Sequence, residues 1–161
     1  MSHYDSDYDN DKAIQFNYNL ELRKNLKHNI YMNIACEIAN LGTCKRLKVG
    51  AVLLRKDGSV ASMGYNGAPS GMDHCTDETC NSENRCIHTL HAEENALRFS
   101  TGEINTAYLT HEPCLNCTRN MALRGVKFIF FKNPYNSMPQ REKDERNAIC
   151  EHFGIRISCL V

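Results

Sequence analysis

Residues 49–65, VGAVLLRKDGSVASMGY, decide the fold class of this 161-residue chain. The apolar run at residues 49–54 is typical of a buried strand, and the KDGS sequence at residues 56–59 is typical of a turn. Residues 60–65 then return as a second strand. The stretch therefore predicts a β-hairpin.

Working outward from the hairpin, the pattern alternates between helices and strands. Upstream, apolar residues recur near helical spacing from about Asn25, and Gly42 is a stop signal. These apolar residues are Ile30, Ile34, Ile38 and Leu41. Downstream of a loop at residues 66–87, we expect helices at 91–99, 113–124 and 142–153 and strands at 107–110, 126–131 and 155–160. This order predicts an α/β fold, a three-layer α-β-α sandwich around one mixed central sheet of about five strands.

Residues 1–24 differ from the rest in composition. Residues 1–11 hold four Asp and no basic residue, and aromatic residues surround them. We expect an acidic, aromatic tail or arm here, either poorly ordered or docked on a neighbouring subunit. Residues 25–161 form a single predicted domain.

Charge and cysteine content restrict the class of protein. Lys plus Arg and Asp plus Glu both number 19, so no general attraction to nucleic acid polymers or membranes is expected. No secretory signal or membrane-spanning stretch is seen, which predicts a cytoplasmic protein, in the host cytoplasm if the source is viral. Nine cysteines in a reducing compartment more often bind metal or perform chemistry than form disulfides.

Two short motifs carry the predicted chemistry. His91-Ala-Glu93 and Pro113-Cys114-Leu-Asn-Cys117 each lie at a predicted helix start. One imidazole and two thiolates form a three-ligand zinc set that leaves a fourth position for water. Glu93 is close enough in sequence to reach that water without ligating the metal. His-x-Glu followed by Pro-Cys-x-x-Cys is the general zinc deaminase signature.

Other interpretations of these motifs stay open. Cys114 and Cys117 also suit a thioredoxin-like redox pair, although that leaves the histidine and glutamate unexplained. A structural zinc site with some fourth cysteine is the non-enzymatic alternative. Glu94 is an alternative proton shuttle, but one residue further round the helix it should point elsewhere, so we expect it to be a surface or partner-binding residue.

A second cysteine cluster is predicted in the polar loop. Cys75, Cys80 and Cys86 lie within twelve residues, with His74 and His88 alongside. Such a loop has little apolar content to hold it, so a structural metal would supply what packing cannot. The fourth ligand should be Cys44, His74 or His88, and free surface thiols are the alternative. The remaining cysteines, Cys36, Cys150 and Cys159, are expected to be buried small apolar residues.

Four motifs carry a resemblance to known proteins. They are Lys48-Val-Gly-Ala51, Gly64-Tyr-Asn-Gly-Ala-Pro-Ser-Gly71, His91-Ala-Glu-Glu-Asn-Ala96 and Glu112-Pro-Cys-Leu-Asn-Cys117. From about Tyr31 onward the chain resembles the cytidine deaminase superfamily, and within it the deoxycytidylate (dCMP) deaminase family of bacteria and phages. The glycine-rich loop followed by a cysteine-rich insertion is the more specific cue.

The resemblance implies a zinc-dependent hydrolase that converts dCMP to dUMP and ammonia, which supplies the precursor of thymidylate. It implies zinc on His91, Cys114 and Cys117, with Glu93 taking a proton from water, giving it to N3, and later protonating the leaving amine. It also implies a cysteine before the Lys-Val-Gly strand and another after the glycine-rich loop. These correspond to Cys44 and Cys75, so the expected second, structural zinc lies on Cys44, Cys75, Cys80 and Cys86.

The resemblance implies substrate and effector contacts as well. Asn66 should contact the sugar, Arg46 and Lys48 are candidates for the 5′-phosphate, and Tyr135 closes the pocket. The basic run at residues 45–56 fits phosphate, or equally a solvated helix end plus a turn. Members are commonly hexamers, activated by dCTP and inhibited by dTTP with Mg²⁺ on the triphosphate. The loop containing Tyr65, Gly67 and Ala68 would then lie between the catalytic and regulatory nucleotides, unless it is only a tight turn.

Two alternative functions are carried forward. The first is another zinc deaminase, acting on free cytosine nucleotides such as dCTP or CMP. Deaminases of tRNA adenosine, guanine or single-stranded DNA are less favoured, because polynucleotide substrates demand a broad basic surface. The second, from a different class, is a non-catalytic structural zinc-binding module.

Overall fold

The computed structural model describes residues 5–80 and 86–160, with side chains from Asn10 onward. The chain divides into two units, Met1–Tyr31 and Met32–Val161. The elements are α1 (Asp5–Ala39), β1 (Gly50–Leu54), β2 (Val60–Tyr65), α2 (Ala92–Phe99), β3 (Thr106–His111), α3 (Leu115–Leu123), β4 (Phe128–Asn133), α4 (Gln140–Phe153) and β5 (Arg156–Cys159).

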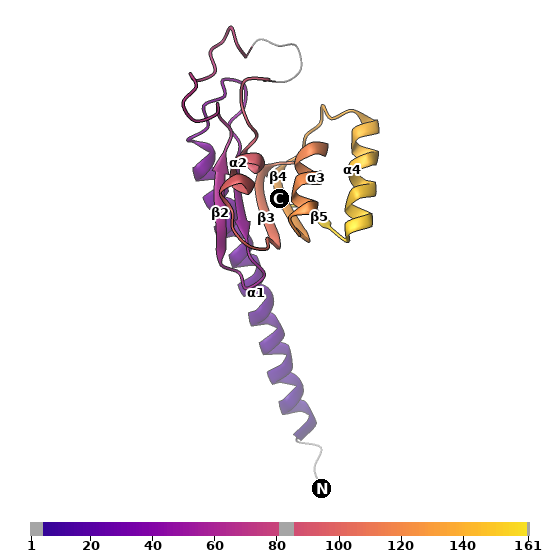
Figure 1. The fold of residues 1–161 in the computed structure, drawn as a ribbon. Helices are drawn as coiled ribbons and strands as arrows, with labels where there is room; N and C mark the ends of the chain where they lie inside the picture. Colours follow the sequence, from indigo (N-terminus) through magenta and orange to yellow (C-terminus); the bar gives the residue numbers. More distant parts are fainter. Residues whose placement is uncertain (1–4, 81–85, 161) are drawn as a thin grey trace. The chain divides into compact units, whose positions relative to one another are not determined.

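The five strands form one mixed sheet in the order β2-β1-β3-β4-β5 (Figure 1). Strand β1 pairs antiparallel with both β2 and β3, and the predicted hairpin is β1 and β2. Strands β3, β4 and β5 run parallel. Helices α3 and α4 connect them, as parallel neighbours require a crossover. Strand β1 is buried along its whole length, in keeping with its continuous apolar sequence.

Two glycines let helices approach the hairpin closely from opposite sides. A Cβ at Gly50 would lie 2.0 Å from the Ala35 carbonyl oxygen of α1, and a Cβ at Gly64 would lie 2.4 Å from the Ala92 carbonyl oxygen of α2. Gly64 pairs with Ala51, the neighbour of Gly50. Because successive strand residues point to opposite faces, the last turns of α1 and helix α2 cover different faces of the sheet.

The main core lies on the α2 face of the sheet. It joins inward residues of the strands to residues of α2, α3 and α4, so these three helices share one layer. Its members include Leu53, Leu109 and Ile129 from the sheet and Ala96 and Met121 from the helices. The last turns of α1 form the opposite layer. The prediction of a three-layer α/β sandwich with a mixed five-stranded sheet is confirmed.

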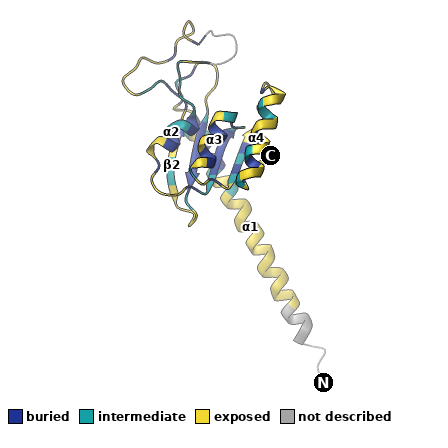
Figure 2. Cartoon of the chain, turned by 45° about the vertical axis from the view of Figure 1, so that its right-hand side comes forward, coloured by how far each residue is buried: buried dark blue, intermediate teal, exposed yellow. Residues whose placement is uncertain are grey.

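Helix α1 differs from its prediction in extent and in buried face. It begins at Asp5, so residues 5–24, expected as a tail, are helical. Hydrogen bonds between side chains one turn apart support this segment, including Lys24 to Glu21 at 2.7 Å. Nearly every residue from 10 to 30 is exposed (Figure 2).

The buried positions of α1 lie in its last turns. They are Met32, Ala35 and Ala39, whereas Ile30 and Leu41 from the predicted apolar set are exposed. Ala35 and Ala39 are small residues at the part of the helix that lies against Gly50. Among the described residues, no helix combines the length and the apolar content needed to cross a membrane.

Candidate active site

The structure brings His91, Cys114 and Cys117 together. His91 immediately precedes α2, and Cys114 immediately precedes α3. The two helices belong to the same layer. The His91 Nδ1 atom lies 3.6 Å from the Cys114 Sγ and 3.4 Å from the Cys117 Sγ. A tetrahedral zinc with ordinary bond lengths would separate imidazole nitrogen from sulfur by about 3.5 Å. The three donors therefore fit zinc without rearrangement.

The three donors share protons through their mutual hydrogen bonds. Hydrogen bonds from Cys117 and His91 lower the pKa of the Cys114 thiol to about 4, against the effect of burial. The Cys114 thiolate in turn raises the pKa of His91 to about 9. The pKa of Cys117 is raised, because it hydrogen-bonds the Cys114 thiolate and is buried. A cation placed between the three would displace the shared protons.

Glu93 lies in the first turn of α2 and is 4% exposed. Burial raises the pKa of its carboxyl to about 7, although the charge of His91 opposes the shift. A carboxyl with that pKa both holds and releases a proton near neutrality, as an acid-base shuttle requires.

Glu94 has a role that the sequence did not predict. Its carboxylate accepts a hydrogen bond from the backbone N–H of His91 at 2.7 Å. Glu94 is half-buried, and its side chain turns back to the start of α2 and holds the predicted metal ligand there.

A cavity of about 550 Å³ adjoins these residues. His91, Glu93 and Cys114 line it, together with residues from the ends of the parallel strands β3 and β4. The other lining residues are Cys44, Arg46, Leu47, Val49, Asn66, Cys86, Thr89, Ala92, His111, Glu112, Pro134, Tyr135, Asn136 and Ser137. The carboxyl ends of parallel strands are the usual ligand-binding edge of an α/β sheet.

The predicted substrate residues divide between this cavity and other places. Arg46, Asn66 and Tyr135 line the cavity. Lys48 lies outside the lining and donates instead to the Asn40 carbonyl, just beyond α1. Asn66 is buried, and its amide already bonds the backbone N–H of Val49 at 2.8 Å and the carbonyl of Leu47 at 2.6 Å. Asn66 therefore holds residues 47–49 in the cavity wall.

The predicted effector residues flank Asn66 but do not line the cavity. Tyr65 is 39% exposed, and its carbonyl accepts a hydrogen bond from Asn95. Gly67 forms an isolated bridge with Leu90. A Cβ at Gly67 would lie 2.9 Å from the Thr43 hydroxyl, so the loop and the residues after α1 are closely packed there. Ala68 follows in the same loop.

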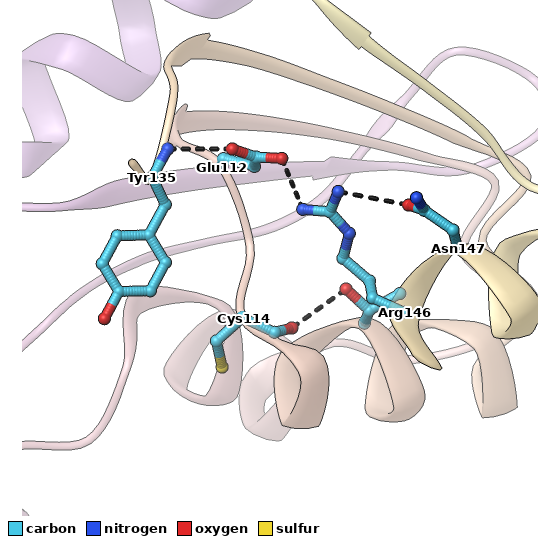
Figure 3. Close-up of polar contacts among 6 residues, drawn as sticks. Glu112, Cys114, Tyr135, Arg146 and Asn147 are labelled. Carbon is cyan, nitrogen blue, oxygen red and sulfur yellow. Dashed lines mark hydrogen bonds and ion pairs between the residues drawn. The ribbon is translucent and has the colours of Figure 1, made fainter. Parts of the chain in front are cut away.

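Sequence reasoning gave no role to two cavity residues, His111 and Glu112. The half-buried His111 ring bonds the Thr110 hydroxyl at 3.0 Å, and burial lowers its pKa. Glu112 forms an ion pair with Arg146 of α4 and accepts the backbone N–H of Tyr135 at 2.8 Å (Figure 3). Their position just before Pro113-Cys114, at the end of a predicted strand, was the available signal.

The second cysteine cluster also assembles. Its four sulfurs all lie within 4.8 Å of one another, and they belong to Cys44, Cys75, Cys80 and Cys86. The sulfurs of Cys44 and Cys80 are 3.8 Å apart, and those of Cys75 and Cys86 are 3.6 Å apart. Zinc bound tetrahedrally by four thiolates would place them about 3.8 Å apart. His88 does not belong to this group of possible metal ligands. Its ring Nε2 hydrogen-bonds the Asp73 carbonyl at 2.7 Å.

The three other cysteines differ from one another. Cys150 is buried as predicted, Cys36 is half-buried and Cys159 is exposed. The prediction for Cys159 is wrong, because β5 forms the edge of the sheet and is mostly exposed.

The sequence around these residues matches a known protein family. Residues 26–133 match the family model of the cytidine and deoxycytidylate deaminase zinc-binding region. The chain belongs to this family. The match contains His91, Cys114 and Cys117 as well as the four-cysteine cluster.

Individual relatives agree with this assignment. The chain is 36% identical over 112 residues to ComE operon protein 2 of Bacillus subtilis, covering 66% of this chain and 59% of that protein. It is 34% identical over 119 residues to the deoxycytidylate deaminase of Mycobacterium phage D29, covering 63% of this chain and 90% of the phage protein. The chain thus spans less than two thirds of the Bacillus protein.

Among solved structures, the chain is similar to the dCMP deaminase of cyanophage S-TIM5 in complex with dCMP and dUMP. The TM-score is 0.67 at 30% identity, covering 82% of this chain and 95% of the cyanophage chain. The cytidine deaminase-like fold predicted from the motifs is confirmed.

Proposed function

We propose that this protein is a zinc-dependent hydrolase that deaminates dCMP to dUMP with release of ammonia, and so feeds thymidylate synthesis. The observation that carries the proposal is the three-donor set of His91, Cys114 and Cys117 beside a buried glutamate in a cavity wall. Three protein ligands leave a fourth position for water, which distinguishes catalytic from structural zinc sites.

The chain's own residues divide the work of the reaction. Zinc, when bound, would lower the pKa of a water molecule and supply the nucleophile. Glu93 would take one proton of that water and pass it to N3 of the cytosine ring as the water oxygen bonds to C4. It would then take the second proton from the new C4 hydroxyl and give it to the amino group, so that the C4–N bond breaks, ammonia leaves and the C4 carbonyl forms. Glu94 would keep His91 in place through the backbone N–H bond at 2.7 Å.

The shape of the cavity supports a mononucleotide as substrate. Its volume of about 550 Å³ is in the range of small-molecule sites. Arg46 is the proposed contact for the 5′-phosphate, while Asn66 and Tyr135 bound the space for the sugar. The formal net charge of zero supports a small substrate over a nucleic acid polymer.

We propose a second, structural zinc on Cys44, Cys75, Cys80 and Cys86. The near-tetrahedral spacing of the four sulfurs supports it. Burial opposes ionisation of Cys86, but hydrogen bonds from Thr89 and His88 lower the pKa of its thiol to about 6. Burial and hydrogen bonds from the other cysteines raise the pKa of Cys80 to about 12, so the metal would have to displace that proton. Cys44 and Cys86 also line the substrate cavity, so the metal would brace its wall.

We further propose a homo-oligomer, a hexamer by family resemblance, activated by dCTP with Mg²⁺ and inhibited by dTTP through the loop of Tyr65, Gly67 and Ala68. Exposed apolar side chains support association, since a monomer gains nothing from them. On α1 they are Ile14, Phe16, Tyr18, Leu20, Leu22 and Leu26. Clustered thiols that would bind metal suit a reducing compartment, which supports the cytoplasm.

A substrate panel tests the proposal. Ammonia release is measured from dCMP, CMP, dCTP and deoxycytidine, with and without dCTP, dTTP and Mg²⁺. We expect the highest kcat/KM with dCMP, and saturation curves that shift with the triphosphates. Preference for CMP or dCTP would support the alternative of another cytosine-nucleotide deaminase. No ammonia from any of them by zinc-loaded protein would overturn the proposal that this protein deaminates dCMP.

A further inference from the structure

The Glu112 side chain lies between the strand that leads to Cys114 and the loop at residues 134–137, which lines the cavity. Glu112 follows β3 and precedes Pro113, and it lines the cavity. Its side chain is 11% exposed. A buried carboxylate needs a positive partner and hydrogen bonds to remain charged.

Both carboxylate oxygens of Glu112 have partners. Arg146, from the second turn of α4, donates its Nη1–H to Oε1, and its own side chain is 7% exposed. The backbone N–H of Tyr135 donates to Oε2 at 2.8 Å. Arg146 also bonds the Asn147 amide at 3.2 Å (Figure 3). One carboxylate thus ties α4 to the first turn of the loop that follows β4.

The loop from Pro134 to Pro139 is held at its start largely through Glu112. The Glu112 N–H bonds the Asn133 carbonyl at 2.8 Å, which continues the pairing of β3 and β4. The backbone hydrogen bonds between β3 and β4 end there. The next connection is the hydrogen bond from the Tyr135 N–H to the Glu112 carboxylate. Residues 134–137 all line the cavity. Without the carboxylate, the next anchor along the chain is the buried Met138.

The ion pair also sets the charge of the cavity wall. An unpaired carboxylate at this place would repel an anionic substrate, and Arg146 neutralises it. A buried ion pair contributes little net stability, but removal of one partner leaves an uncompensated buried charge, here in the cavity wall.

We propose that Glu112 and Arg146 are positioning residues for substrate binding: the pair holds the 134–137 loop against the nucleotide and removes the negative charge that would repel its phosphate. The inference rests on the proposed function. Neither residue exchanges protons with the substrate, so the pair acts on KM more than on kcat.

Steady-state kinetics with dCMP test the proposal. R146M leaves the Glu112 carboxylate unpaired, and we expect KM to rise at least tenfold while kcat changes less than threefold. R146K keeps the charge without the planar fork and should recover part of the loss. The double variant E112Q/R146M removes both charges. Its KM should be no higher than that of R146M, because the two changes act on one pair.

The chain offers a matched control. Arg119 and Glu145 form an ion pair of the same chemistry between α3 and α4, at 3.6 Å, but with side chains 47% and 56% exposed. We expect R119M to leave KM and kcat within twofold of wild type. An equal rise of KM in R119M and R146M would assign the effect to helix packing and contradict the proposal.

Hydrogen exchange supplies a readout that does not depend on activity. The Tyr135 amide should exchange slowly in the wild type and at least tenfold faster in E112A, which has no acceptor, with E112Q in between. R119M should exchange as the wild type does. If E112A leaves the Tyr135 amide protected, the tether is wrong. If the wild type deaminates no nucleotide but exchange behaves as expected, the tether stands and the proposed function fails.

Discussion

The two candidate metal-binding clusters share thiol donors but differ in their surroundings and in the histidine that only one of them contains. His91, Cys114 and Cys117 lie at the starts of two helices that pack on the sheet, and they border the cavity. Cys75, Cys80 and Cys86 belong to the long connection between β2 and α2, which has no helix or strand in its described part. One cluster offers three donors and the other four.

The difference in donor number separates reactivity from support. A metal with four thiolates has no place for water, so it can only hold chain segments together. A metal with three donors keeps one position for a reactant, and its ligands must be held by the rest of the fold. Substitutions and metal removal at each cluster can test whether the three-donor site is reactive and the four-thiolate site structural.

The first test is E93Q at the three-donor site. The amide fills the same space but cannot shuttle a proton, so we expect kcat to fall by roughly 10²- to 10⁴-fold. Zinc content by elemental analysis and the thermal midpoint should stay near wild type. Loss of zinc in E93Q would make Glu93 a ligand instead, and retained turnover would assign the proton transfer to another group.

The second test removes one sulfur donor from each cluster in turn. C80S should lose one zinc per chain and lower the free energy of unfolding by at least about 2 kcal/mol, because the long connection has little other support. Its matched control, C114S, should also lose one zinc, but it should lose nearly all turnover with a smaller change in stability. Denaturant unfolding, native mass spectrometry and ammonia release measure the three quantities. If C80S binds as much zinc as wild type, the second site is refuted.

The third test removes metal in steps with a competing chelator. A site open to the cavity exchanges its ion through a free coordination position, whereas a closed four-thiolate site must first open its loop. We expect activity to disappear before the folded state does. Circular dichroism measures the folded state, and ammonia release measures activity on the same samples. Simultaneous loss of both would show that the two metals are coupled.

The fourth test weakens the support of His91 without touching a donor. E94Q replaces the carboxylate that accepts the His91 N–H, and we expect zinc affinity at the catalytic site to fall by about tenfold. T79A is its counterpart near the other cluster, where the Thr79 hydroxyl accepts the Thr76 N–H at 2.8 Å. T79A should leave the affinity of the catalytic site unchanged, as measured by competition with a zinc indicator.

The smallest expected effect concerns the hairpin turn, far from both clusters. Hydrogen bonds from Ser59 lower the pKa of the exposed Asp57 below its ordinary value. A lowered carboxyl pKa stabilises the folded state above the unfolded pKa, and that contribution is lost as pH falls through the folded pKa. D57N should therefore be slightly less stable than wild type at pH 7 and equal to it in strong acid. Zinc content should not change.

Local patterns predicted the parts of the fold that depend on neighbours in the chain. The hairpin, the alternation of helices and strands, and the placement of His91 and Cys114 at helix starts all follow from residues a few positions apart. Burial was less predictable. Ile30 and Leu41 have helical spacing but are exposed, and Cys159 is exposed because its strand forms a sheet edge.

By itself, the sequence determined the donor chemistry: the His-x-Glu and Pro-Cys-x-x-Cys spacings and the supply of thiols. Only the tertiary structure decided which side chains face each other across long separations. It brings Cys44 within 3.8 Å of Cys80, directs Lys48 away from the cavity, and joins Glu112 to Arg146. Such contacts depend on which helix packs against which strand, and the spacing of residues along the chain does not determine how far apart these side chains lie.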